Sequence, residues 1–367
     1  MSSRNFVCVL ILSGLLTLAP VGRPVLGKTA LPVRVEGAAH SVRDCAQEGQ
    51  LRSAAGAAVT LHLRNLSNRP LKAYWLDYAG KRKFYFELSP WTSVVQPTFS
   101  GHPWLLADTQ EHCQGIVVAT GARPLPARPF PLAQQIGPVP AEAGLAPFYA
   151  KYLNPSGVPV LASARVKDQA LLKAATLMQK LIGNRPDLLA ALMRSEVRVG
   201  IIGTSEQTLE MPEYTDLDKT DPGTDWNSRA RGLGPTSRRP LSSVGEENLL
   251  CSPVDRYRGE DIFVHEFGHA IQMALETIDQ GFKQRLNQAY QKALKAGRWK
   301  DTYAASNPEE YWAEGVQSWF DVNQTVAAID GVHNLVNTRA ELQAYDPDLA
   351  ALLGQTFGKQ PVMQLCR

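Results

Sequence analysis

Between residues 59 and 120 the chain alternates apolar and polar positions over short runs. Residues 59–63, with the sequence VTLHL, are one such run, and turn signals at residues 65–68, 79–80 and 100–101 separate the runs. A period of two places successive side chains on opposite faces of a strand. The pattern therefore predicts a small all-β sandwich over residues 41–122.

The following segment, residues 123–140, is dominated by proline. It begins with the sequence RPLPARPFP and also contains Pro138 and Pro140. Proline has no amide hydrogen and cannot pair in the interior of a sheet. We expect an extended linker here, unable to pair in a sheet, and place the domain boundary in it.

Beyond residue 141 the apolar spacing becomes helical. Residues 168–182, 187–193 and 261–278 have this spacing, whereas residues 197–202 form a compact apolar run typical of a strand. A stretch rich in glycine, proline and arginine at residues 215–253 has neither pattern, and long loops in compact domains are usually functional or mobile. A chain of 367 residues usually needs two cores. The predicted class is α+β, with a mainly helical second domain and a small sheet over residues 141–367.

Composition and the N-terminus narrow the setting. Hydrophobic residues make up 44% and charged residues 20% of the chain, and a net charge of +3 does not indicate a nucleic-acid partner. Arg4 precedes an apolar run at residues 6–19 and then Val25, Leu26 and Gly27, which predicts an export signal over residues 1–27. The run is shorter than the ~20 residues of a membrane span, so a retained anchor is the weaker alternative. We expect an extracellular or periplasmic protein without stable membrane insertion.

Four cysteines remain after removal of such a signal. Cys45 and Cys113 bracket the first domain, and Cys251 and Cys366 both lie in the second. An even number of cysteines in an exported protein predicts two disulfides, and of the three pairings we expect the one within each domain. Free buried thiols are the alternative, and a four-cysteine zinc site is disfavoured because no two cysteines have close ligand spacing.

The helix at residues 261–278 contains the sequence HEFGH. His265 and His269 are separated by four residues, so both imidazoles lie on one helical face, one turn apart, and can share a metal ion. Glu266 lies beside the first histidine, where its carboxylate can act as a general base toward a water molecule at that metal. This is the chemistry of the HExxH motif, and it predicts one catalytic zinc ion per chain.

A catalytic zinc ion requires a third protein ligand and an open position for water. Residues 307–320 begin with an N-cap asparagine and a proline and continue with helical spacing, which places Glu310 and Glu314 on one face. One of the two glutamates can bind zinc directly, and the other can orient a ligating histidine. The spacing alone does not decide which does which.

The C-terminal half resembles the gluzincin metallopeptidases, most closely the branch that contains the catalytic domain of anthrax lethal factor. That branch has a tyrosine, a glutamate ligand seven residues later and a second glutamate four residues further on, and Tyr303, Glu310 and Glu314 have these separations. The resemblance implies that Glu310 is the third ligand, that Glu314 supports a ligating histidine, and that the hydroxyl of Tyr303 stabilises the oxyanion. It covers residues 261–320 with specific motifs. It also suggests that the strand at residues 197–203 belongs to the sheet on the substrate side.

The first domain resembles the β domain of the von Hippel-Lindau tumour suppressor, through the sequences YWLDYAG at residues 74–80 and TFSGHPWL at residues 98–105. That family binds 4-hydroxyproline between aromatic rings, with a serine and a histidine at the hydroxyl. The resemblance implies a pocket of Trp75, Tyr85, Thr98, His102 and Trp104, with Phe99 beside it. Thr98 replaces the family's serine but keeps a hydroxyl, and Phe99 replaces a tyrosine. Aromatic residues at alternating strand positions are also typical of a plain core.

The sequence thus predicts a secreted zinc endopeptidase whose β domain recruits a protein or peptide substrate. Proline- or hydroxyproline-rich chains are the candidate substrates. The competing hypothesis is a catalytically inactive secreted binding protein with a peptidase-like domain. Convergence of His265, His269 and Glu310 at zinc-ligand distances would favour the enzyme over that alternative.

Overall fold

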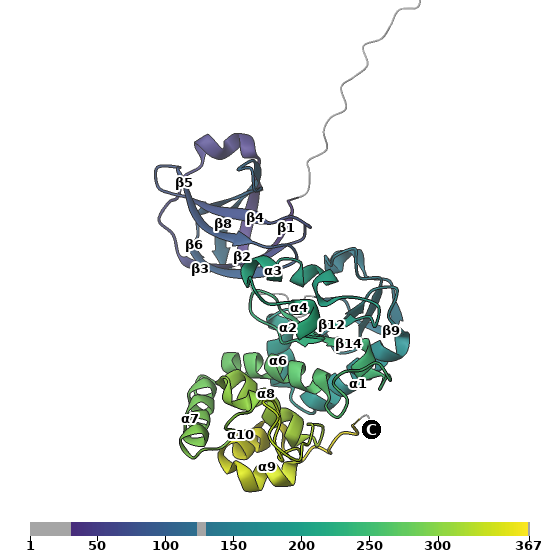
Figure 1. Ribbon diagram of the computed structural model, residues 1–367. Helices are drawn as coiled ribbons and strands as arrows, with labels where there is room; N and C mark the ends of the chain where they lie inside the picture. The colour runs from purple at the N-terminus through teal and green to yellow at the C-terminus, as the bar shows by residue number, and fades with distance from the viewer. Residues whose placement is uncertain (1–30, 123–129, 366–367) are drawn as a thin grey trace, which may run out of the picture. The chain divides into compact units, whose positions relative to one another are not determined.

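A computed structural model describes residues 31–122 and 130–365. The expected export signal and Cys366 lie outside the described residues. Within these residues, strands predominate in the N-terminal part and helices in the C-terminal part, which agrees with the predicted mixture of a β region and a later helical region (Figure 1). No helix among the described residues is long and apolar enough to cross a membrane.

The N-terminal domain consists of two antiparallel sheets. One has the strand order β1-β3-β6 and the other the order β2-β8-β7-β4-β5. The strands are β1 (Val33–Glu36), β2 (Ala38–Arg43), β3 (Ala58–Asn65), β4 (Leu71–Leu76), β5 (Arg82–Leu88), β6 (Ser93–Phe99), β7 (Pro103–Ala107) and β8 (Cys113–Ala122). Because β1 and the first half of β2 precede residue 41, the strands of this region begin earlier than the sequence pattern predicted.

The alternation seen in the sequence is realised in β3. Val59, Leu61 and Leu63 are buried, whereas Thr60 and His62 between them are only half-buried. The inward side chains of the two sheets form one apolar core, as expected where strands alternate between a packed and a more open face.

The Cys45–Cys113 disulfide joins the 3₁₀ helix η1 (Cys45–Gln50) to the first residue of β8, with an S–S distance of 2.05 Å. This confirms the first of the two predicted pairings, and a disulfide is typical of exported proteins. The second pairing, Cys251 with Cys366, stays a prediction because Cys366 is outside the described residues.

The second domain contains a six-stranded mixed sheet with the order β13-β14-β12-β11-β10-β9. Its strands are β9 (Ala133–Gly137), β10 (Lys151–Asn154), β11 (Val160–Ala162), β12 (Arg198–Ile202), β13 (Gly232–Leu233) and β14 (Leu241–Gly245). The pairs β11/β12 and β12/β14 are parallel, and the other pairs are antiparallel.

Two expectations about this region were wrong. The segment assigned to the linker contains β9, which pairs with β10, because its prolines flank the strand and β9 lies at the edge of the sheet. The stretch at residues 215–253 is not a long loop, since it contains α3 (Leu217–Thr220), α4 (Trp226–Arg229), β13, β14 and α5 (Glu246–Leu249). These elements are only two to five residues long, too short for their periodicity to show in the sequence.

The remaining helices form the bulk of the second domain. They are α1 (Asp168–Ile182), α2 (Pro186–Arg194), α6 (Ile262–Ile278), α7 (Phe282–Lys295), α8 (Pro308–Trp319), α9 (Arg339–Tyr345) and α10 (Pro347–Phe357). Helix α6 packs against α1, α2 and β14 on one side and against α8 on the other, and α7, α9 and α10 surround α8 (Figure 1). The main core lies along α6 and α8, and these two helices position the candidate site.

Candidate functional site

Helix α6 holds the two histidines in fixed positions. Asp261 caps its first turn by accepting a hydrogen bond from the backbone N–H of Val264 at 3.1 Å. Phe263 and Phe267 are fully buried in the main core, so the rotation of the helix about its axis is set by packing. The imidazoles of His265 and His269 consequently lie together, with ring centroids 5.0 Å apart.

Helix α8 brings Glu310 to the two imidazoles. Asn307 caps the helix by accepting from the backbone N–H of Glu310 at 2.8 Å, and Pro308 occupies the first turn. One carboxylate oxygen, Oε2 of Glu310, lies 3.0 Å from Nε2 of His265 and 3.5 Å from Nε2 of His269. Two donors bound to one tetrahedral zinc ion at about 2.0–2.1 Å lie about 3.3 Å apart. The three side chains therefore fit a zinc ion.

The charges at this site are strongly coupled. Burial raises the pKa of Glu310, but the contacts with His265 and His269 outweigh burial and hold it well below its usual range. Burial lowers the pKa of His265, yet the contacts with Glu310 and Glu314 carry it well above its usual value. Each group thus stabilises the charged form of the other, and a metal cation can take the place of the imidazole proton.

Glu266 lies next to this group of donors. His265, Glu266 and His269 each offer one donor atom, and these atoms lie within 4.8 Å of one another. Oε2 of Glu310 is also closer to the imidazole nitrogens than this limit, so Glu310 is within reach of an ion held by the two histidines. Burial raises the pKa of Glu266, and the two imidazoles oppose that rise. A carboxylate with a raised pKa is suited to accepting and returning a proton.

Tyr303 reaches the same site from the 3₁₀ helix η5 (Tyr303–Ala305). Its ring stacks over the ring of His265 with centroids 6.2 Å apart. Burial raises the pKa of Tyr303 to about 12, so the hydroxyl keeps its proton at neutral pH and can donate a hydrogen bond. The structure thus brings Tyr303 together with the HExxH residues and Glu310.

Two residues of α8 approach the other nitrogen of His265. Oε1 of Glu314 lies 3.4 Å from Nδ1, and Oε1 of Gln317 lies only 2.9 Å away. The resemblance pointed to Glu314 and missed Gln317. Positions 310, 314 and 317 nevertheless follow the i, i+4, i+7 spacing of one helical face, and this signal was available in the sequence.

The candidate ligands open into a cleft of about 830 Å³. Besides these ligands its lining includes Trp226, Leu233, Pro235, Met273, Glu309 and Val332. Besides β14, strand β13 also contacts α6, and a Cβ added at its Gly232 would lie 3.1 Å from Cγ of Glu266. Strand β12, which the resemblance suggested to be part of the sheet on the substrate side, lies in the interior of this same sheet, and β13 forms its edge.

A second polar group lies in the N-terminal domain, among the six residues that the sequence analysis singled out. Nε1 of Trp104 donates to Oγ1 of Thr98 at 2.9 Å, and the same oxygen lies 3.4 Å from Nδ1 of His102. The ring of Trp75 packs on His102 at 5.3 Å and edge-on to Tyr85 at 6.3 Å. These five residues form what we call the aromatic cluster.

The aromatic cluster is buried at its base and open at its rim. Thr98, His102 and Trp104 are buried, whereas Tyr85 is 49% exposed. Phe99 at 47% and Tyr78 at 61% exposure extend the rim; Tyr78 packs on both Trp75 and His102 and was not included in the predicted pocket. Among the described residues, Nε1 of Trp75 and Nε2 of His102 are buried polar atoms without a hydrogen-bond partner. Such atoms suit a ligand that brings its own polar group.

Comparison with known proteins bears on the N-terminal domain. Residues 51–120 match the family model described as the VHL beta domain. The chain matches no curated protein and no solved structure. The N-terminal domain is therefore a VHL-like β domain, as the sequence predicted.

Proposed function

We propose that the second domain is a zincin-like metallopeptidase of the gluzincin type, a zinc-dependent endopeptidase with His265, His269 and Glu310 as metal ligands. One observation carries the proposal: Oε2 of Glu310 lies 3.0 and 3.5 Å from the two imidazole nitrogens. These distances are close to the ~3.3 Å that separates two donor atoms bound to one tetrahedral zinc ion. Two histidines and a glutamate leave the fourth position open for water, the arrangement of catalytic rather than structural zinc.

The roles of the neighbouring side chains follow from their positions. When bound, the zinc ion supplies Lewis acidity, which polarises the peptide carbonyl and lowers the pKa of water. Glu266 accepts the proton from the attacking water and returns it to the leaving amine. The protonated hydroxyl of Tyr303 would donate a hydrogen bond to the carbonyl oxygen as negative charge develops on it. The cleft beside β13 accommodates an extended peptide across these groups.

Metal content and proteolysis of the purified wild-type chain and three variants test this proposal. Wild type is expected to hold about one zinc ion and to cleave a mixed peptide library. Glu266→Gln should keep zinc and lose activity, by about 100-fold or more, because only the proton acceptor is removed. Glu310→Gln should lose zinc, whereas Glu309→Gln, its exposed neighbour, should keep it. A wild-type chain without zinc or cleavage would instead support the inactive secreted binding protein.

We further propose that the VHL-like domain recruits substrates that contain proline or hydroxyproline, through the aromatic cluster. Aromatic walls suit a flat pyrrolidine ring, and the unpartnered Nε1 of Trp75 and Nε2 of His102 suit a hydroxyl group. A site built for a hydroxyl discriminates against its absence, because its buried polar atoms then stay unpaired.

The test is a pair of peptides that differ only in proline or hydroxyproline. We expect tighter binding of the hydroxylated peptide, and loss of that preference in Thr98→Val, which removes the hydroxyl at the base of the cluster. Thr60→Val, a half-buried threonine on β3, serves as the control. Equal affinity for both peptides, or no binding of either, would refute the recruitment proposal. Together with an export signal, these roles describe a secreted protease that is held on its substrate.

A further inference from the structure

The orientation of the His265 ring depends on which group accepts the hydrogen bond from Nδ1–H. A histidine binds metal through one nitrogen, and the hydrogen bond of the other nitrogen fixes its tautomer and ring angle. Here Nε2 faces Glu310, and Nδ1 faces Gln317 and Glu314, which lie further along α8. Oε1 of Gln317 is the nearer acceptor at 2.9 Å, against 3.4 Å for Oε1 of Glu314. Glu314 also accepts a hydrogen bond from Nδ2 of Asn323 at 2.9 Å.

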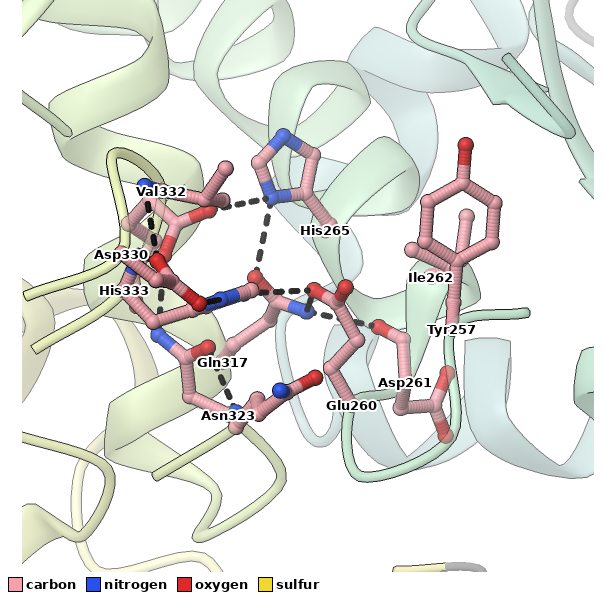
Figure 2. A network of polar contacts seen from close by, with 12 residues as sticks. Tyr257, Glu260, Asp261, Ile262, His265, Gln317, Asn323, Asp330, Val332 and His333 are labelled. Atoms are coloured by element: carbon pink, nitrogen blue, oxygen red, sulfur yellow. Dashed lines mark hydrogen bonds and ion pairs between the residues drawn. The ribbon is translucent and has the colours of Figure 1, made fainter. Parts of the chain in front are cut away.

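The amide of Gln317 has a defined orientation. Its Nε2 donates to Oε2 of Glu260 and to the backbone carbonyl of Asp261, both at 3.2 Å. Both partners are acceptors, so the amide nitrogen must face them and the amide oxygen must face His265. Gln317 is fully buried, which removes water as a competing partner. Figure 2 shows Gln317 between His265 on one side and Glu260 and Asp261 on the other.

Glu260 is in turn held by the loop that follows α8. Nε2 of His333 lies 3.5 Å from Oε2 of Glu260, and Asp330 accepts from the backbone N–H of His333 at 2.7 Å. The same loop supplies the carbonyl of Val332, which accepts from the backbone N–H of Tyr303 at 2.9 Å. The chain of contacts from His265 through Gln317 and Glu260 to His333 (Figure 2) thus ends in a loop that also holds Tyr303.

We propose that Gln317, held by Glu260, is the positioning residue of this metal centre. Its carbonyl oxygen accepts a hydrogen bond from Nδ1–H of His265, so that the lone pair of Nε2 points toward Glu310 and His269. The inference rests on the proposed zinc site. Gln317 contacts none of the reacting groups and acts only through His265. A neutral amide serves this purpose because its oxygen accepts the hydrogen bond from Nδ1–H but is too weak a base to remove the proton.

Zinc affinity of the purified full chain, measured by competition with a chromophoric chelator, tests the inference. Gln317→Met keeps the length of the side chain but removes the acceptor, and we expect zinc affinity to fall about 10- to 100-fold. Gln272→Met removes a buried glutamine that donates to Glu276 on α6 and, among the described residues, makes no hydrogen bond to either histidine; it should change affinity less than threefold. Gln317→Asn, which withdraws the carbonyl from His265, should weaken zinc as Gln317→Met does and is available if the methionine variant does not fold.

An exchange of groups separates positioning from mere packing. The double variant E260Q/Q317E places a carboxylate next to His265 and an amide in the position of Glu260, so the hydrogen bond from Nδ1 of His265 is kept and the one between residues 260 and 317 is restored with donor and acceptor reversed. It should recover zinc affinity to within about threefold of wild type. Wild-type affinity in Gln317→Met, or a double variant as weak as Gln317→Met, would overturn the inference while leaving the zinc site intact. A wild-type chain that takes up no zinc would refute the proposed function, and this inference with it.

Discussion

Gly234 follows strand β13 and lies directly against the ring of His269. A Cβ added at this position would stand 2.7 Å from Cδ2 of His269 and 2.8 Å from its Cβ. Carbon atoms in ordinary contact are about 3.5–4.0 Å apart. The substitution Gly234→Ala therefore demands that the imidazole move by about 0.8 Å or more. It changes the position of a candidate ligand without removing any donor atom.

The magnitude follows from where this displacement is felt. In the metal-free chain the ring of His269, whose side chain is 14% exposed in the cleft, can turn away from the new methyl group, while the contact with Cβ of His269 is relieved by a small shift of the segment in both states. In the zinc-bound chain the ring must return, because metal–ligand distances tolerate only about 0.2 Å. Overpacking by one methyl group costs about 1–3 kcal/mol, and 1.4 kcal/mol corresponds to a factor of ten, so we expect zinc to bind about 5- to 140-fold more weakly.

The assay is zinc titration of Gly234→Ala against Gly137→Ala. Gly137 is the last residue of β9 at the opposite edge of the same sheet, and an added Cβ there meets no atom within 4 Å. The Gly137 variant should match wild type in zinc affinity. Equal affinities for all three proteins would refute the placement of His269 at the metal.

Two further predictions concern stability. Removing the Cys45–Cys113 disulfide by substitution to serine should destabilise the VHL-like domain by about 4 kcal/mol, because a bond across 68 residues lowers the entropy of the unfolded chain. A loss below about 1 kcal/mol in urea unfolding would contradict this reasoning. Burial lowers the pKa of His333, but the contact with Glu260 acts in the opposite direction, and the net result is a pKa raised to about 9. Because this folded-state value exceeds the unfolded one of about 6.5, the stabilisation is complete below pH ~6.5 and disappears as the pH rises through 9. Zinc-free wild type should exceed His333→Asn in unfolding free energy by about 1–2 kcal/mol more at pH 6 than at pH 10, allowing for screening, and a pH-independent difference would exclude this pair.

Local pattern predicted the elements that carry the site. The helical spacing of residues 261–278 and the Asn-Pro start of the helix at residue 307 correspond to α6 and α8 in the structure. The four-residue spacing of His265 and His269 places them together in any helix, whatever the tertiary fold. The alternation at residues 59–63 likewise reappears in β3, because a period of two is encoded within the strand itself.

Features that depend on distant pairing could not be predicted in this way. Strand β9 pairs with β10 and lies in the sheet although prolines flank it, and β13 is only two residues long. The 3.0 Å approach of Glu310 to His265 joins residues 45 positions apart, which spacing alone cannot fix. Gln317 carried a weak helical-face signal, but its value lies in a hydrogen bond to His265 that only the packing of α8 on α6 reveals.

Diffraction from crystals of the full chain at the zinc absorption edge tests the central claim most directly. We expect one anomalous peak, about 2.0–2.2 Å from Nε2 of His265, Nε2 of His269 and a carboxylate oxygen of Glu310, with a position left for water. A crystal grown with zinc that shows no peak there, or a peak bound by other side chains, would contradict the metallopeptidase assignment.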